Sequence, residues 1–338
     1  MKKVSILYIG NKLSSHGYNQ TSIETLGSFL SSEGFEIITS SSIKNQILRL
    51  IAMCWSVVNH RNDVQYILID TYSTHSFWYA FFTSQLARFY KIKYIPILRG
   101  GELPNRLKNS PYFSKLLFKH AHHNIAPSHY LQKVFNDFGF ENIVFIPNSI
   151  EHKKYQFRER NNIEPKILWV RAFASIYNPK MAIDVFAKIK QNYPKATLCM
   201  IGPDKDGSLE TTKSYSASLG LETIFTGGLP KETWNELAKE YDVFINTTHF
   251  DNTPVSVIEA MALGLPVVST NVGGIPYLLE DKNEALLVND NDVNAMAKQV
   301  EYLLTHPAEV SRITQNALNK VKTFDWEVVK YQWFELLS

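Results

Sequence analysis

The chain has 338 residues, about twice the length of a typical domain, so two domains are expected. With 45% hydrophobic and 20% charged residues, its composition is that of a folded globular protein and excludes a disordered or collagen-like chain. The net charge is only +3, Cys54 and Cys199 are too few for a disulfide scaffold, and no run approaches the roughly 20 apolar residues that span a bilayer. We therefore expect a cytoplasmic protein with reduced thiols.

In the first half, short β-branched runs alternate with helical stretches, which predicts an α/β domain with mainly parallel strands. The expected strands are 4–9, 35–39, 65–70, 93–98, 123–126 and 142–146. The first of them follows Met1-Lys2-Lys3 and is too short for the apolar core of a secretory signal. A loop that contains Gly10 and Gly17 is expected to lead into a helix beginning near Thr21.

A polar, charged segment at 149–165 predicts the boundary between the two halves. In the second half the expected strands are 166–170, 196–201, 223–225, 243–246, 266–269 and 285–288. Two doubly wound Rossmann-like domains would place their ligands at the carboxyl ends of the strands, in a central cleft. We expect the first domain at 1–150, the second at 151–322, and a C-terminal helix within 323–338.

The stretch 251–276, DNTPVSVIEAMALGLPVVSTNVGGIP, is the most informative part of the sequence. Its pattern predicts a helix over 255–263, with Thr253 as its N-cap and Pro254 at the first helical position. Gly264 is expected to end this helix, since glycine is the usual residue just beyond a helix C-terminus.

Two carboxylates frame the predicted helix start. Asp251 precedes it, and Glu259 lies about one and a half turns into the helix. The free N–H groups and the positive end of the helix favour a bound anion, and an ionised carboxylate can accept hydrogen bonds from a sugar diol. The segment therefore predicts a site for a phosphate and a sugar. An ordinary βαβ unit with two solvated surface acids is the alternative.

This segment resembles the donor-binding signature of the retaining glycosyltransferases of family 4, which have the two-domain GT-B fold. That signature has an acid, seven residues, a Glu followed by Ala-Met-Ala, a Gly-x-Pro-Val-Val strand and a Gly-Gly turn. Here 259–262, 264–268 and Gly273-Gly274 match. Asp251 stands where the family has Glu, which keeps the charge but shortens the side chain by one methylene group.

Two cations follow the first strand of the second half. Arg171 comes directly after strand 166–170, and Lys180 follows the loop AFASIYNP. A planar guanidinium and a point charge both suit a diphosphate. In the resembled family an Arg and a Lys of this loop hold the donor diphosphate, which makes Asp251, Arg171 and Lys180 the candidate catalytic residues. Val170 replaces the family's Gly, and the Arg–Lys spacing is longer than in many members, so surface cations flanking a loop remain the alternative.

Glycines follow two further strands of the second half, where they allow a ligand to approach the backbone closely. In the resembled family these positions border the nucleotide. Glycine after a strand is also common turn chemistry. The candidate substrate-binding residues of this half are Glu259, Asn252, Thr253, Pro254, Val255, Gly202, Gly227 and Gly228.

In the first half, Arg99 and Gly100 follow strand 93–98 at the edge where a ligand is expected, so both are candidate substrate-binding residues. Many members of the resembled family have a His at this strand end, and the chain departs from them here. His75, in the loop after strand 65–70, is an alternative histidine near this edge. A loop or helix-cap role is the simpler interpretation of this histidine.

A metal site is not expected. No Cys or carboxylate is spaced to complete a ligand set with His120, His122 and His123. Asp-x-Asp elements at 204–206 and 290–292 lie in polar turns before helices, where aspartates are more simply helix caps.

The basic charge is concentrated in the first half. Residues 1–150 contain 15 Lys and Arg against 8 Asp and Glu, net +7, whereas 151–338 contain 20 against 24, net −4. The stretches 43–60 and 104–120 mix Lys and Arg with Leu, Phe and Trp. They predict either a peripheral contact with an anionic membrane or a lipid-linked acceptor, or ordinary sheet-packing helices with solvated basic faces.

These features predict a retaining glycosyltransferase that needs no metal or other cofactor. It would move a sugar from a nucleotide-diphosphate sugar to a glycan or lipid-linked acceptor, in surface polysaccharide or glycoconjugate synthesis at the inner face of the membrane. No nucleic-acid partner is expected. The alternatives are a nucleotide-sugar epimerase on the same fold and a non-catalytic protein that binds a nucleotide sugar.

Overall fold

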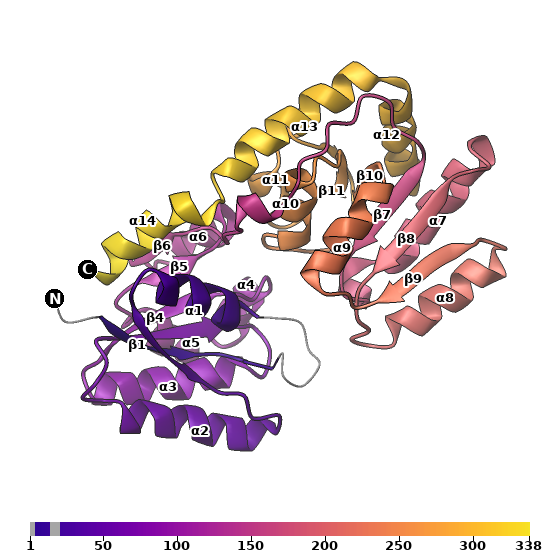
Figure 1. The fold of residues 1–338 in the computed structure, drawn as a ribbon. Coiled ribbons are helices and arrows are strands. Elements are labelled where there is room, and N and C mark those ends of the chain that lie inside the picture. The colour runs from indigo at the N-terminus through magenta and orange to yellow at the C-terminus, as the bar shows by residue number, and fades with distance from the viewer. Residues whose placement is uncertain (1–3, 14–20) are drawn as a thin grey trace. The chain divides into compact units, whose positions relative to one another are not determined.

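The computed structural model describes residues 4–13 and 21–338. The chain divides into two compact units, each with its own sheet and helices (Figure 1). Unit 1 runs to Pro147 and includes Val329–Ser338, and unit 2 is Asn148–Val328. Gly17, which the sequence assigns to a loop, lies outside the described residues. Among the described residues, no helix combines the length and apolarity needed to cross a membrane.

Unit 1 alternates strands and helices in chain order. Its elements are β1 (Ser5–Ile9), α1 (Ser22–Ser32), β2 (Glu36–Ser40), α2 (Gln46–Asn59), β3 (Tyr66–Thr71), α3 (Phe77–Phe89), β4 (Lys93–Leu98), α4 (Leu103–Asn109), α5 (Pro111–Phe118), β5 (Asn124–Ala126), α6 (His129–Asp137) and β6 (Ile143–Phe145). Helix α1 begins near Thr21, as the sequence predicts, and Thr21 is its N-cap and forms a capping box with Glu24.

The six strands of unit 1 form one parallel sheet in the order β2-β1-β3-β4-β5-β6. Strands β1 and β3 are buried along their whole length, which explains why both are almost continuous apolar runs. The chain order reverses between β1 and β3, so this is the switch point at which open sheets bind ligands.

Unit 2 has the same alternation. Its elements are β7 (Lys166–Val170), α7 (Pro179–Asn192), β8 (Thr197–Ile201), α8 (Ser208–Ser218), β9 (Thr223–Gly227), α9 (Lys231–Leu237), β10 (Val243–Asn246), α10 (Val255–Ala262), β11 (Val267–Thr270), α11 (Ile275–Leu278), β12 (Leu286–Val288), α12 (Val293–Thr305) and α13 (Pro307–Lys322), with short 3₁₀ turns η2 (His152–Lys154), η3 (Ser175–Tyr177) and η4 (Ala238–Glu240).

The sheet of unit 2 is also parallel, with the order β12-β11-β10-β7-β8-β9. Its switch point lies between β7 and β10. The prediction of two doubly wound, Rossmann-like α/β units is therefore confirmed. Each strand expected from the sequence is present, and its ends lie within two residues of the predicted ones.

The last helix, α14 (Trp326–Leu337), begins in unit 2 and ends in unit 1. Within unit 1, Lys330 forms an ion pair at 3.2 Å with Glu33, the C-cap of α1, and the ring centroids of Phe334 and Phe35 lie 5.9 Å apart. The Tyr66 hydroxyl donates a hydrogen bond to the Ser338 carbonyl at 3.3 Å. These contacts fix the C-terminal part of α14 on unit 1.

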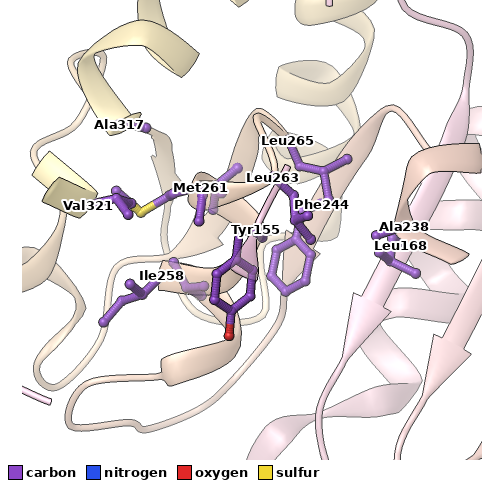
Figure 2. Packing of buried hydrophobic residues seen from close by; sticks show 14 of the residues in the cluster. Tyr155, Leu168, Ala238, Phe244, Ile258, Met261, Leu263, Leu265, Ala317 and Val321 are labelled. Atoms are coloured by element: carbon purple, nitrogen blue, oxygen red, sulfur yellow. The ribbon is translucent and has the colours of Figure 1, made fainter. Parts of the chain in front are cut away.

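One hydrophobic core of unit 2 lies around α10, which buries Ile258 and Met261 (Figure 2). Helix α13 packs on α10 and contributes Ala317 and Val321 to the same core. Tyr155 also belongs to this core although it lies in the polar segment that follows unit 1. Helix α10, which contains Glu259, is therefore packed against α13 and the segment around Tyr155.

Candidate active site

The first two predicted catalytic residues meet at the switch point of unit 2. Strands β7 and β10 are neighbours there, Arg171 follows β7, and the loop after β10 contains Asp251. Arg171 Nη2 donates to Asp251 Oδ2 in an ion pair, and the two side chains are 14% and 13% exposed. A cation and an anion therefore lie together at the edge where open α/β sheets bind ligands.

Two further contacts orient Arg171. Its backbone N–H donates to the Ile201 carbonyl at 3.0 Å, which extends the pairing of β7 and β8 by one residue. Its guanidinium carbon lies 4.0 Å from the ring centroid of Tyr177, in a cation–π contact. Arg171 Nε is buried and has no hydrogen-bond partner within the described part of the chain. A bound anion would satisfy this donor.

Gly202 packs directly against the backbone of Arg171. A Cβ atom at position 202 would lie 1.7 Å from the Arg171 carbonyl oxygen, so no other residue fits without moving the loop. Gly202 N–H also donates to the Gly227 carbonyl at 2.9 Å, and Gly227 has a φ of +71°. A Cβ at Gly228 would meet Pro203 at an ordinary 3.5 Å. Two of the three predicted glycines are thus required by the backbone around Arg171.

The Gly-Gly turn of the signature supports the loop that carries Asp251. A Cβ at Gly273 would lie 2.4 Å from the Asp251 carbonyl oxygen, and one at Gly274 would lie 1.8 Å from that of Asn252. Gly274 N–H donates to the Asp251 carbonyl at 2.8 Å, and Asn252 N–H donates to the Asp251 carboxylate at the same distance. The position of Asp251 therefore depends on a close approach that only glycines allow.

The start of α10 differs from the sequence prediction by one residue. Pro254, and not Thr253, is the N-cap: its φ and ψ of −69° and 113° are extended, and its carbonyl accepts from Val257 at 3.1 Å and Ile258 at 3.4 Å. Proline fits this place because an N-cap residue needs a free carbonyl and no N–H. Val255 is the first helical residue, and buried Ser256 Oγ has no partner in the described ranges.

Glu259 is buried on α10, and two residues that sequence reasoning missed hold its carboxylate. Tyr155 Oη donates to Glu259 Oε1 at 2.7 Å, and Lys231 Nζ lies 2.8 Å from the same oxygen. Burial, followed by the negative charge of Glu259, raises the pKa of the Tyr155 phenol far above its ordinary value. The phenol therefore stays protonated and donates to the carboxylate.

Sequence signals for these missed residues exist but are weak. Tyr155 is one of two aromatic residues in the otherwise polar segment 149–165, and Lys231 follows the Gly-Gly-Leu-Pro turn after β9. Tyr177, which stacks on Arg171, lies in the loop between the two predicted cations. Each of these residues could be recognised as a site residue only after a neighbouring strand end had been assigned to the site.

Residues 151–320 match the family described as glycosyl transferases group 1, over half of the chain. The chain belongs to this family. Sulfoquinovosyl transferase SQD2 of Arabidopsis thaliana is 27% identical over 155 residues, which are 45% of this chain and 28% of that protein. The matched parts cover 43% and 47% of two further curated relatives, so the chain spans less than half the length of these three proteins.

Solved structures with the same fold align with nearly the whole chain. Sucrose-phosphate synthase of Thermosynechococcus elongatus superposes with a TM-score of 0.82 at 15% identity, over 99% of this chain and 98% of that one. Anabaena Alr3699/HepE, in complex with UDP and glucose, has a TM-score of 0.78 at 17% identity and 99% coverage of both chains. The two Rossmann-like units are those of the GT-B fold.

The third predicted catalytic residue of this group 1 protein, Lys180, does not share the environment of Arg171. It lies in the first turn of α7, and its Nζ is 4.6 Å from the ring centroid of Tyr215 on α8. Asn178 caps α7 in the left-handed conformation, with φ +46°, and ends the loop before Lys180. A different lysine, Lys231, forms an ion pair with the predicted site residue Glu259.

The two Asp-x-Asp elements act as caps and turn residues, as predicted. Asp204 Oδ1 accepts from Gly207 N–H at 3.1 Å, and Asp206 Oδ1 accepts from Ser208 N–H at 3.2 Å. Asp292 is the N-cap of α12 and accepts from Ala295 N–H at 2.8 Å. Among the described residues, no three His, Cys, Asp or Glu side chains are grouped to hold a metal ion.

Arg99 and Gly100 belong to unit 1, near the switch point of its sheet. Arg99 Nε donates to Asp70 Oδ1 at 3.1 Å, and Tyr8 Oη donates to the same oxygen at 3.0 Å. The Asp70 side chain has no exposed surface, and burial raises the pKa of its carboxyl although Arg99 and Tyr8 act in the opposite direction. A Cβ at Gly100 would lie 2.6 Å from Ser73 N, so Gly100 serves a close backbone approach.

A surface cavity of about 650 Å³ lies at the other end of the sheet of unit 2. Its lining includes Lys166, Thr197 and Asp242, which start or precede β7, β8 and β10. Ligands of open α/β sheets bind at the carboxyl ends of the strands. We therefore place the candidate site of this family member at Arg171, Asp251 and the start of α10, and not in this cavity.

Proposed function

We propose that the protein is a retaining glycosyltransferase that moves a sugar from a nucleotide-diphosphate sugar to an acceptor. The Arg171–Asp251 pair at the switch point of unit 2 carries this proposal. It combines a half-satisfied guanidinium with a carboxylate, beside the first turn of a helix. The name of the GT-B neighbour in complex with UDP and glucose supports a nucleotide-sugar donor.

Three of the predicted residues have defined roles in this proposal. Arg171, whose Nε lacks a partner among the described residues, binds the diphosphate together with the N–H groups of the first turn of α10. Asp251 accepts hydrogen bonds from the donor sugar and gives up part of its contact with Arg171 when the diphosphate binds. Glu259 accepts from the ribose diol, and Tyr155 and Lys231 hold its carboxylate in place.

The chemistry follows from where charge develops. The transition state of glycosyl transfer is oxocarbenium-like, and negative charge grows on the departing diphosphate. Fixed cations and helix N–H groups that face this charge stabilise it more than they stabilise the ground state. Arg171 supplies the nearest cation in this proposal, with Lys231 or Lys180 as the second one. Turnover then needs no divalent metal.

The acceptor is a glycan or a lipid-linked glycan, in surface polysaccharide or glycoconjugate synthesis. In this proposal unit 2 binds the donor, and unit 1, with its net positive charge, faces the acceptor. The enzyme works in the cytoplasm at the inner face of the membrane that carries a lipid-linked acceptor.

Donor hydrolysis tests the activity directly. The purified chain is incubated with a panel of nucleotide-diphosphate sugars that varies base and sugar, without acceptor, and free nucleotide diphosphate is measured. We expect slow release from one donor class and none from the Arg171→Ala variant. An isomerised sugar still linked to the nucleotide identifies an epimerase, and binding without release from any donor identifies a non-catalytic binding protein.

Chelation tests the proposed metal independence. Turnover of the preferred donor is measured before and after dialysis against a chelator. We expect the rate to stay within about twofold, because cations of the protein and a helix terminus neutralise the leaving group. A complete loss that Mg²⁺ or Mn²⁺ reverses contradicts this part of the proposal and leaves the donor assignment intact.

A further inference from the structure

Helix α2 of unit 1 is apolar on both of its sides. Its inner residues Met53 and Val57 are fully buried in the core of unit 1. Its outer apolar residues are unusually open to solvent, with exposed fractions of 72% for Ile47, 54% for Leu48, 58% for Ile51 and 67% for Trp55. A surface helix of a soluble domain normally presents polar residues on this side.

The spacing of these residues makes one continuous stripe. Leu48, Ile51 and Trp55 are three and four residues apart and therefore lie on the same side of the helix, opposite Met53 and Val57. The one charged residue in the sequence of α2, Arg49, is buried: its Nε donates to the Ile43 carbonyl at 2.6 Å and its Nη1 to Asn11 Oδ1 at 2.9 Å. The outer stripe thus has no charge of its own.

The neighbouring helices add aromatic side chains. Helix α3 packs on α2 and on α5, and α2 and α3 run side by side on one side of the sheet (Figure 1). Trp78 and Phe81 of α3 lie 5.2 and 5.3 Å from Phe113 of α5 between ring centroids. Phe82 and Tyr112 in the same two helices are 44% and 68% exposed. We call the α2 stripe and this α3–α5 cluster together the apolar face.

Positive charge predominates around the apolar face. The sequences of α2, α3, α4 and α5 contain no Asp or Glu. Besides the buried Arg49, these helices contain Arg88, Arg106, Lys108 and Lys115, and the exposed Lys44 and Lys119 flank them. The exposed acids Asp63, after α2, and Glu102, before α4, are fewer than these cations. An apolar surface with mainly positive charge around it fits a partner that has a negatively charged surface and an apolar interior.

We propose that the apolar face docks on an anionic membrane, with Ile47, Leu48, Ile51 and Trp55 inserted among the acyl chains. Exposed apolar residues gain by leaving water, tryptophan favours the boundary between headgroups and hydrocarbon, and surrounding lysines are attracted to anionic lipids. A second copy of the chain is disfavoured as occupant, since identical basic surfaces repel. This inference deepens the membrane contact proposed above by assigning it to a defined surface, and it does not depend on the donor.

Vesicle co-sedimentation tests this inference. The probes are vesicles of phosphatidylcholine alone and of phosphatidylcholine with about 30% phosphatidylglycerol. The anionic lipid gives the second kind the negative surface potential that attracts basic residues. We expect binding to the anionic vesicles that weakens as salt rises. The double variant Ile51→Ser/Trp55→Ser should bind at least about tenfold less. The matched control is Leu219→Ser/Ile224→Ser, which removes two exposed apolar side chains of unit 2 and should bind like the wild type.

Tryptophan fluorescence tests insertion rather than proximity. Adding anionic vesicles should shift the emission to shorter wavelength, and Trp55→Phe should bind as well as the wild type but lose most of the shift. Equal binding by the Ile51→Ser/Trp55→Ser variant and the wild type, or no binding to either vesicle, overturns the inference. So does a dimer in sedimentation that this variant dissociates. Donor hydrolysis without vesicles should be the same for the variant and the wild type, which separates a failure here from a failure of the proposed function.

Discussion

Arg171 and Asp251 in unit 2 and Arg99 and Asp70 in unit 1 are both arginine–aspartate pairs near the switch point of a six-stranded sheet. In unit 1 the aspartate has no exposed side-chain surface, the Tyr8 hydroxyl supplies a second hydrogen bond to Oδ1, and the buried Oδ2 has no hydrogen-bond partner among the described residues. In unit 2 the aspartate is 13% exposed, and Arg171 retains a donor that no described residue satisfies.

The difference indicates two uses of the same pair. A pair whose aspartate is fully buried contributes to the integrity of unit 1, because loss of Arg99 leaves a carboxylate that has neither exposed surface nor a cation. A partly exposed pair whose arginine has an unsatisfied N–H can replace part of its internal contact by a bound ligand with little loss of free energy. The Arg99 pair is therefore expected to matter for stability, and the Arg171 pair for turnover.

The largest expected effect is on the stability of unit 1. Arg99→Met leaves the buried Asp70 carboxylate without its cation, which we expect to lower the free energy of unfolding by about 3–5 kcal/mol. Urea denaturation followed by circular dichroism measures this change. Arg61→Met, which removes an exposed arginine of the same unit, is the control and should change stability by less than about 0.5 kcal/mol. A similar small change in both variants contradicts the structural role of Arg99.

The stability loss of Arg99→Met should depend on pH. Burial raises the pKa of Asp70 above its ordinary value of 3.8, so the folded state holds this proton more tightly than the unfolded chain. Stability therefore falls as pH rises through the window above 3.8, and removing Arg99 extends this window upward because Arg99 lowers the pKa. We expect the deficit of the variant to be larger at pH 8 than at pH 5. An equal deficit at both pH values contradicts this assignment.

In unit 2 the corresponding change should affect chemistry more than folding. Arg171→Ala removes the guanidinium proposed to face the leaving diphosphate, and we expect turnover to fall by about 100-fold or more, with a change in unfolding free energy of about 1 kcal/mol or less. Lys180→Met, measured beside it, tests the second predicted cation. Because Lys180 Nζ lies on the Tyr215 ring, we expect a smaller loss from it than from Arg171→Ala. The reverse order contradicts our assignment.

The two units also differ in how much of them can be predicted from sequence. Strands and switch points follow from apolar periodicity, and Arg171 and Asp251 can be predicted as site residues because a strand end and a helix start both have local signals. Their contact with each other is not predicted. The Arg99–Asp70 contact joins two strand ends whose side chains carry no such signal, so Arg99 is predicted as a substrate residue and not as a partner of Asp70. Tyr155 is missed for the same reason, since its polar surroundings hide a contact with Glu259, 104 residues away.

Glu259 and its partners test the nucleotide side of unit 2. Glu259→Gln keeps the shape of the side chain but loses its charge, and we expect nucleotide diphosphate to bind about 10- to 100-fold more weakly, a loss of roughly 1.5–3 kcal/mol. Titration calorimetry measures this affinity. Glu236→Gln is a matched control, because Glu236 is an exposed acid on α9 that pairs with Lys239. If the two variants bind nucleotide equally well, Glu259 does not contact the ribose.

The smallest expected effect concerns Tyr155. Tyr155→Phe removes one hydroxyl that donates to Glu259 at 2.7 Å and leaves the ion pair with Lys231 in place. A typical hydrogen bond contributes about 0.5–1.5 kcal/mol, so nucleotide affinity should fall by about 2- to 12-fold. Tyr241→Phe, at another buried tyrosine of unit 2, should leave affinity unchanged. If Tyr155→Phe lowers the unfolding free energy but not the affinity, the phenol serves the core around α10 and does not position Glu259.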